Sequence, residues 1–156
     1  MISSVKNPKV VAAARLHKRA MREHDRRFLV EGGQGVREAL AEIPPALQTL
    51  FVEDDLHELA VRAREVGVEV VHADAAVVTR LTSTVTPQGV VGVAPFVDVG
   101  LDALGGGCVA ILHEVRDPGN AGTIVRSADA SGADGIVFST SSVDVYKCER
   151  SNCGSC

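Results

Sequence analysis

Residues 117–130 read DPGNAGTIVRSADA and carry the most informative pattern in this chain. The apolar run 108–112, which we expect to be a buried strand, precedes them. A Ser/Gly-containing segment, 131–135, and a second apolar run, 136–138, follow them. A strand, a Pro/Gly/Asn turn, a polar helix, a glycine stop and a strand predict one βαβ unit. Because polar side chains crowd the helix start beside the carboxyl end of a strand, the pattern predicts a ligand site there.

Two chemical interpretations of this helix start stay open from the residues alone. In the first, Asn120 caps the helix, the first N–H groups favour an anion, and Arg126 holds a phosphate with parallel N–H bonds. In the second, Asn120 is only a cap and Arg126 pairs with Asp129 three positions later, as is common on helix surfaces.

The positive charge of the chain is concentrated at its N-terminus. The net charge of the 156 residues is −4, which by itself argues against nucleic-acid binding. Residues 1–27, however, hold eight basic and two acidic side chains, whereas the rest of the chain holds eight basic and eighteen acidic ones. This asymmetry is typical of a basic segment that meets phosphate groups, although a solvated helix without a partner has the same pattern.

Asn7 and Pro8 predict the start of a helix that continues over about residues 9–24. The apolar face of this helix is narrow, so we expect it to pack lightly against the rest of the chain. Its candidate contacts to a nucleic-acid substrate are Arg15, Lys18, Arg19 and Arg22.

Strands and helices are expected to alternate through the following residues. The expected strands are 28–30, 50–52, 68–71 and 89–96, and the expected helices are 34–42, 54–66 and 74–81. This order predicts an α/β fold with a small parallel or mixed sheet and helices packed against it. Residues 97–107 end in three glycines and are expected to be a linker.

Residues 112–134 closely resemble the first motif of the SpoU (TrmH-type) RNA 2′-O-ribose methyltransferases of the SPOUT superfamily. Shorter segments support the resemblance by their order and spacing. Residues 28–32 with 36–40 resemble the start of the family's substrate-binding domain, 87–93 its end, and 143–146 the family's next strand and loop. The resemblance covers about residues 1–146.

The resemblance implies a small N-terminal α/β domain that binds RNA, followed by the first part of a SPOUT (α/β-knot) methyltransferase domain. The implied boundaries are 1–27 for a basic helix, 28–96 for the RNA substrate-binding domain, 97–107 for a linker and 108–156 for an incomplete methyltransferase domain. S-adenosylmethionine would donate a methyl group to a ribose 2′-hydroxyl of ribosomal or transfer RNA, with ribosomal RNA favoured.

The resemblance also assigns roles to two residues of the motif. Arg126 matches the family's catalytic arginine, and Asn120 matches an asparagine on the substrate side of the site. Arginine is almost never deprotonated in proteins. We therefore expect Arg126 to hold a phosphate and stabilise developing negative charge rather than to act as a base.

The resemblance ends before two later motifs of the family, which build the S-adenosylmethionine pocket and the knot. The residues that hold the cofactor are therefore expected in the half that this sequence lacks, and we expect the 156-residue chain to bind S-adenosylmethionine poorly and to be inactive. Family members form homodimers through the knot domain, which leaves dimerisation of this chain open. The alternative function is a non-catalytic RNA-binding module with a vestigial methyltransferase segment.

The last residues contain Cys148, Cys153 and Cys156 in a C-x4-C-x2-C spacing. This spacing matches part of an iron–sulfur pattern or three zinc ligands, but the fourth cysteine that either needs does not follow. We therefore expect free thiols and no metal, with a metal-binding regulator as the weakest alternative. Since the sequence has neither a signal peptide nor a membrane-length apolar run, we expect a cytoplasmic protein without membrane contact.

Overall fold

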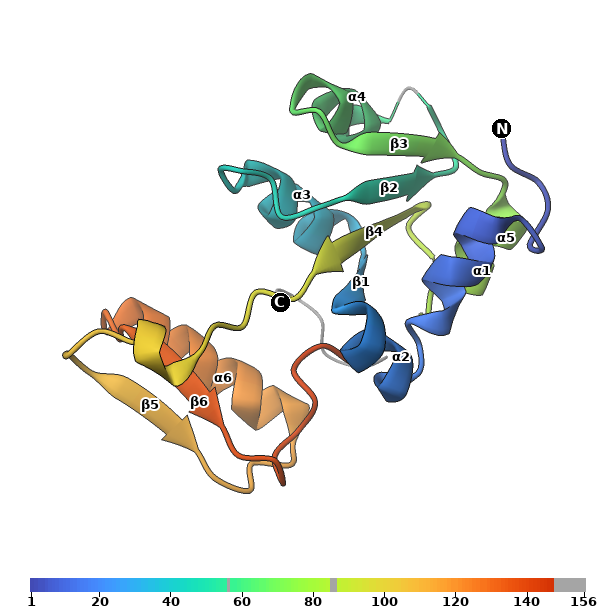
Figure 1. Cartoon of the computed structure of the whole chain (residues 1–156). Coiled ribbons are helices and arrows are strands. Elements are labelled where there is room, and N and C mark those ends of the chain that lie inside the picture. The colour runs from blue at the N-terminus through green and yellow to red at the C-terminus, as the bar shows by residue number, and fades with distance from the viewer. Residues whose placement is uncertain (56, 85–86, 148–156) are drawn as a thin grey trace. The chain divides into compact units, whose positions relative to one another are not determined.

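The computed structural model describes residues 1–55, 57–84 and 87–147, which fall into two compact units (Figure 1). Of the described residues, the first unit contains Met1–Phe96 together with Tyr146 and Lys147, and the second contains Val97–Val145. Both units combine helices with sheets, which confirms the expected α/β class.

The first unit is built on a mixed four-stranded sheet with the order β1-β4-β2-β3. Its strands are β1 (Arg27–Glu31), β2 (Thr49–Val52), β3 (Glu69–His72) and β4 (Val90–Pro95). Strands β2 and β3 are parallel, and β4 is antiparallel to both of its neighbours. The last strand of this unit, β4, therefore lies inside the sheet, and the mixed sheet that the strand order predicted is confirmed.

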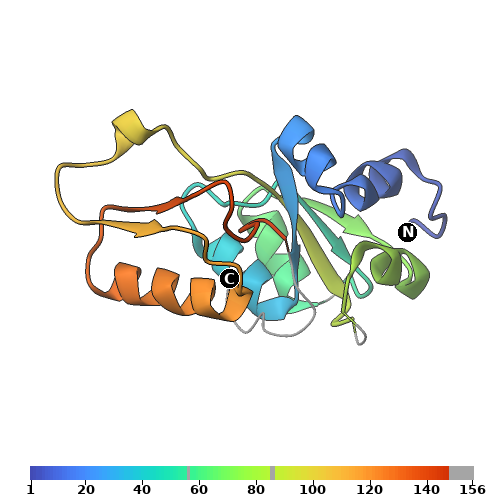
Figure 2. The ribbon, with the colours of Figure 1, turned by 90° about the horizontal axis from the view of Figure 1, so that it is seen from below.

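Helices cover both faces of this sheet, as Figures 1 and 2 show. One face carries α1 (Pro8–Arg15) and α5 (Ala75–Leu81), and the other carries α3 (Gly33–Ala41) and α4 (Glu58–Glu65). Successive side chains of a strand point to opposite faces. Phe51 and Val91 accordingly pack in the core beneath α1 and α5, whereas Leu50 and Val90 pack in the core beneath α3 and α4.

The basic N-terminal segment forms two helices, so the prediction of one lightly packed helix was wrong. Helix α1 ends at Arg15, and α2 spans Arg19–Asp25. Val10, Ala13 and Leu16 are at most 4% exposed and belong to the core against the sheet. The break lies at Leu16, which is buried at the end of α1 and begins a turn rather than a further helical turn. The predicted cap is confirmed, because the Asn7 side chain accepts a hydrogen bond from the Lys9 amide.

Helix α4 begins at Glu58, four residues later than predicted. The loop before it is held outside the helix by Arg64, which donates to the Asp55 carbonyl at 3.0 Å and pairs with the Asp55 carboxylate. The His57 ring nitrogen then accepts from the Leu59 amide and caps the helix. Leu56, which falls within the helix predicted over 54–66, lies outside the described residues. Asp74, the first residue of the helix predicted over 74–81, caps α5 by accepting from the Val77 amide at 3.0 Å.

The second unit contains the βαβ motif that the opening stretch predicts. Strands β5 (Val109–Leu112) and β6 (Gly135–Phe138) are parallel, and α6 (Pro118–Ala130) connects them. A short 3-10 turn, η1 (Leu101–Ala103), lies within the segment expected to be a linker. Residues 143–146, which resemble the family's next strand and loop, form a loop and a turn without a strand.

Strand β5 is less buried than its apolar sequence suggested. Leu112 is 2% exposed, but Ile111 is 73% exposed, and Cys108 is also exposed. Adjacent side chains of a strand face opposite sides, and in the described part of this unit α6 covers one side of the β5–β6 pair. The expectation of a fully buried strand was therefore wrong.

Among the described residues, no helix combines the length and apolar character needed to cross a bilayer.

Candidate functional site

The start of α6 is the first candidate site, and its cap differs from the predicted one. The Asp117 carboxylate, not Asn120, caps the helix by accepting from the Asn120 amide at 2.7 Å. Asn120 lies in the first turn, and its side chain is exposed. Pro118 occupies the first helical position, where its missing N–H costs no hydrogen bond. The amide side chain of Asn120 is therefore available for a polar ligand rather than consumed as a cap.

Arg126 lies one turn beyond Thr123 on the exposed surface of α6. Its guanidinium donates to the Thr123 hydroxyl at 3.4 Å, and that hydroxyl donates to the Gly119 carbonyl at 2.9 Å. A Cβ at Gly122 would lie 3.5 Å from the Arg126 guanidinium, so this side chain folds back toward the helix start. Within the described residues, Arg126 makes no ion pair with Asp129. The interpretation of Arg126 as half of a helical ion pair was therefore wrong, and the guanidinium keeps donors for an anion.

The loops at the carboxyl ends of β5 and β6 hold a cluster of serine hydroxyls that the sequence interpretation did not single out. Ser139 accepts from the Glu114 amide at 3.1 Å and lies 3.0 Å from the Ser142 hydroxyl, which donates to the Leu112 carbonyl. Glu114 has a φ of 54°, a left-handed conformation that costs energy in a non-glycine residue. These bonds fix the loop that leads into α6. The run of serines directly after an apolar strand was the signal for this cluster.

The basic surface of the first unit is the second candidate site. Arg15, Lys18 and Arg19 are exposed around the turn between α1 and α2, although Arg19 also pairs with Glu23 at 2.7 Å. Arg22, the fourth predicted contact, is only 4% exposed. Its guanidinium donates to two carbonyls of the turn, those of Leu16 and His17, at 2.8 and 3.0 Å. Arg22 thus satisfies backbone groups that the helix break leaves open.

No cluster of metal-ligating side chains occurs in residues 1–55, 57–84 and 87–147. The cysteine pattern at the end of the sequence lies outside these ranges, so its predicted free thiols stay a prediction.

Known proteins similar to this chain are RNA methyltransferases. The 23S rRNA (guanosine(2553)-2′-O)-methyltransferase RlmP of Bacillus subtilis is 32% identical over 145 residues, covering 93% of this chain and 56% of that relative. An AdoMet-bound rRNA methyltransferase from Sinorhizobium meliloti matches with a TM-score of 0.73 and 30% identity, covering 94% of this chain and 56% of that structure. The SpoU methyltransferase AviRb from Streptomyces viridochromogenes, solved with AdoMet, matches with a TM-score of 0.74 and 27% identity over 91% of this chain and 56% of that structure.

The chain thus spans a little over half the length of each of these relatives. The family of the MRM3-like substrate binding domain matches residues 7–92, which include all four strands of the first unit except the end of β4. With this domain followed by the βαβ unit that carries the SpoU-like motif, the chain belongs to the SpoU (TrmH-type) family of RNA methyltransferases.

Proposed function

We propose that this chain takes part in S-adenosylmethionine-dependent 2′-O-methylation of a ribose in RNA, with ribosomal RNA as the substrate and the cytoplasm as the location. The observation that carries the proposal is the exposed surface of α6, where Asn120 and the donors of Arg126 stand beside the carboxyl ends of two parallel strands. Similarity to rRNA methyltransferases solved with AdoMet supports the choice of RNA and methyl donor.

The chemistry of the reaction fits the residues on α6. S-adenosylmethionine supplies an already activated methyl group, so the protein mainly has to align the 2′-hydroxyl and stabilise its negative charge as the proton leaves. Arg126, permanently charged, is assigned to a phosphate next to the reacting ribose and to this developing charge. Asn120 is assigned to orienting the ribose through its amide.

The described residues of the second unit fit the RNA better than the methyl donor. Asn120, Thr123 and Arg126 are all polar and exposed on α6. An exposed polar surface of this kind suits a ribose-phosphate backbone, whereas a nucleoside cofactor needs a concave and mostly apolar site. We therefore assign none of these side chains to S-adenosylmethionine. Family members form homodimers, and we propose no surface of this chain as the dimer contact.

A non-catalytic RNA-binding module is the second candidate function, and one observation favours it. The first unit buries two apolar cores on the two faces of a sheet, whereas the second unit leaves much of a two-stranded sheet exposed. RNA binding can therefore reside in the first unit alone, through the exposed Arg15, Lys18 and Arg19.

Binding of the purified chain to a fragment of ribosomal RNA tests the proposal. Replacing Arg15, Lys18 and Arg19 by alanine removes up to three phosphate contacts. The slope of log K against log salt should then become shallower by about 2, at about 0.7 per contact on single-stranded RNA. Fluorescence anisotropy of labelled RNA between low and physiological salt measures this slope.

A triple variant of equal charge on the opposite face is the matched control. Arg37, Arg62 and Arg64 lie on α3 and α4, and each pairs with a carboxylate. Their replacement by alanine should leave the salt slope unchanged. Equal losses in both triple variants, or no RNA binding by the unmodified chain, would contradict the proposal. Methyl transfer to the same RNA, measured by mass spectrometry of its nucleosides, separates the two functions, because the binding module transfers none.

A further inference from the structure

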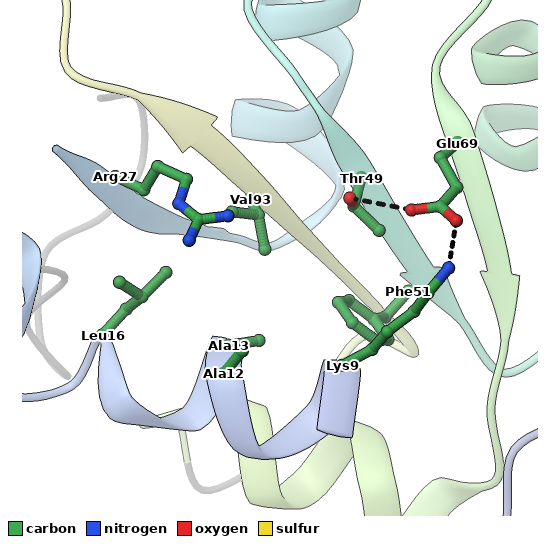
Figure 3. Close-up of a pocket in the computed structure, with 9 residues that line it drawn as sticks. All are labelled: Lys9, Ala12, Ala13, Leu16, Arg27, Thr49, Phe51, Glu69 and Val93. Carbon is green, nitrogen blue, oxygen red and sulfur yellow. Dashed lines mark hydrogen bonds and ion pairs between the residues drawn. The ribbon is translucent and has the colours of Figure 1, made fainter. Parts of the chain in front are cut away.

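A groove of about 200 Å³ lies in the first unit between α1 and the sheet. Its floor consists of almost fully buried apolar side chains, Ala13 and Leu16 from α1 and Phe51 and Val93 from the sheet, none more than 5% exposed. Figure 3 shows these side chains facing each other across the groove. Because these side chains pack together in the core, the floor is a closed apolar surface, on which a flat ring can rest but where it finds no hydrogen bond.

The rim of the groove, in contrast, is polar and partly open to solvent. Lys9, Arg27, Thr49 and Glu69 line it. Glu69 pairs with Lys9, and its other oxygen accepts from the Thr49 hydroxyl at 3.2 Å. The Glu69 side chain is still 49% exposed. Each carboxylate oxygen can accept two hydrogen bonds, so Glu69 retains acceptor capacity toward the groove.

The charge state of Glu69 follows from these partners. The hydrogen bond from Lys9 lowers the pKa of the Glu69 carboxyl below its ordinary value of 4.5, and partial burial opposes this shift. At neutral pH the carboxylate is ionised and only accepts hydrogen bonds. Arg27, whose guanidinium lies 4.0 Å from the Asp25 carboxylate, reaches from β1 toward Val93 and offers donors on the other side (Figure 3).

We propose that this groove binds one unstacked guanine base of the RNA substrate, with its N1–H and amino groups donating to Glu69 and its carbonyl accepting from Arg27. The inference rests on the proposed function, because it takes RNA to be the ligand of the first unit. Guanine is the base that presents two adjacent donors to a single carboxylate, together with an acceptor for arginine. Reading an extruded base by its Watson–Crick edge, with apolar side chains against the ring, is a known mode of recognition.

Size and position favour a base over a cofactor. Pockets for drug-sized ligands have volumes of about 300–1,000 Å³. A groove of about 200 Å³ accordingly suits one ring system. The groove also lies on α1, next to the exposed Arg15 that we assign to phosphates, and nearly all of its lining falls within the matched substrate-binding domain, residues 7–92.

Replacement of a single guanosine by inosine, which lacks the amino group, tests the inference. A set of short RNAs that differ only in the position of the inosine is titrated into the full chain by anisotropy. At one position the unmodified chain should bind the guanosine RNA on the order of tenfold more tightly than the inosine RNA. Glu69→Gln, in which an amide donor replaces one acceptor, should abolish this ratio.

Two pairs of variants separate recognition from structural damage. Glu65→Gln removes another exposed, ion-paired carboxylate outside the groove and should keep the guanosine/inosine ratio. Ala12→Leu narrows the groove and should reduce the ratio, whereas Val11→Leu, on the 45% exposed Val11 outside the lining, should keep it. Circular dichroism confirms that each variant is folded.

The outcomes distinguish this inference from the proposed function. RNA binding without any inosine-sensitive position, or with a ratio that survives Glu69→Gln, overturns the guanine site and leaves RNA binding intact. Absence of RNA binding by the unmodified chain overturns both. A ratio lost in Glu69→Gln and Ala12→Leu, but kept in both control variants, establishes the site.

Discussion

Replacing Arg22 by methionine should destabilise the first unit rather than weaken its contact with RNA. Methionine keeps much of the apolar stem but removes the guanidinium that donates to the Leu16 and His17 carbonyls at 2.8 and 3.0 Å. A buried carbonyl that loses its donor costs about 1–3 kcal/mol, and the carbonyl of His17 lies in a less buried environment. The loss should therefore total about 3 kcal/mol.

Urea unfolding followed by circular dichroism measures this loss. At an m-value of about 2 kcal/mol/M, 3 kcal/mol corresponds to a fall of about 1.5 M in the midpoint. Arg19→Met is the matched control, because Arg19 is 60% exposed and pairs with Glu23 one turn away. Such an exposed pair contributes about 0.3–0.5 kcal/mol, which shifts the midpoint very little.

Two results would refute this reasoning. If Arg22→Met and Arg19→Met had equal midpoints, the bonds to the turn would contribute no measurable stability. If Arg22→Met kept its midpoint but bound RNA more weakly than Arg19→Met, Arg22 would be a phosphate contact, as the charge pattern alone predicted.

Three further predictions concern packing, ionisation and catalysis. Leu81→Ala, in the core beneath α1 and α5, should lower the free energy of unfolding in urea by about 2–5 kcal/mol. Val61→Ala, at an exposed site, should lower it by less than about 0.5 kcal/mol, and equal losses would contradict the assignment of this core. Lys9→Met should raise the pKa of Glu69 toward 4.5 in an NMR titration. The Glu69 pKa is lower in the folded state than in the unfolded state, so any stability that this pair contributes is present above about pH 4.5 and is lost as the pH falls through the folded-state pKa. The stabilities of Lys9→Met and the unmodified chain should therefore converge in acid. An unchanged Glu69 pKa in Lys9→Met would rule out Lys9 as the cause of the lowered pKa. Catalysis can be tested in a chimaera in which residues 108–145 replace the matching segment of the Bacillus subtilis relative. There Arg126→Ala should slow methyl transfer on the order of a hundredfold or more, because one charge-stabilising donor is lost, whereas Ser127→Ala should not slow it. Equal rates in both variants would show that Arg126 takes no part in the reaction.

Local signals in the sequence predicted much of the fold. Glycines and prolines at the ends of apolar runs predicted the alternation of strands and helices. The caps at Asn7 and Asp74 follow from the preference of short polar side chains for the first position of a helix. The motif at residues 117–130 correctly indicated a helix between parallel strands. These features depend on neighbours within a few positions, which is the range over which sequence patterns carry information.

Features that depend on distant residues were missed. The helix break after Arg15 becomes favourable because Leu16 enters the core and Arg22 bonds the turn, and neither contact is visible in a helical pattern. Similarly, Asp117 caps α6, although the Asn120 side chain is of a type that caps helices equally well. The groove beside α1 joins Lys9 to Glu69, sixty positions apart, and no local motif marks such a pair.

The interior position of β4 has a consequence for synthesis and for the choice of fragments. Until residues 90–95 have left the ribosome, β1 lacks β4, the strand that pairs with it in the described sheet, so the unit cannot assemble stepwise from its N-terminus. A fragment cut at residue 92, where the family match ends, would lose the pairs of Val93, Ala94 and Pro95 with β1. An expressed substrate-binding domain should therefore extend at least through Phe96, whose amide donates to the Arg26 carbonyl at 2.9 Å.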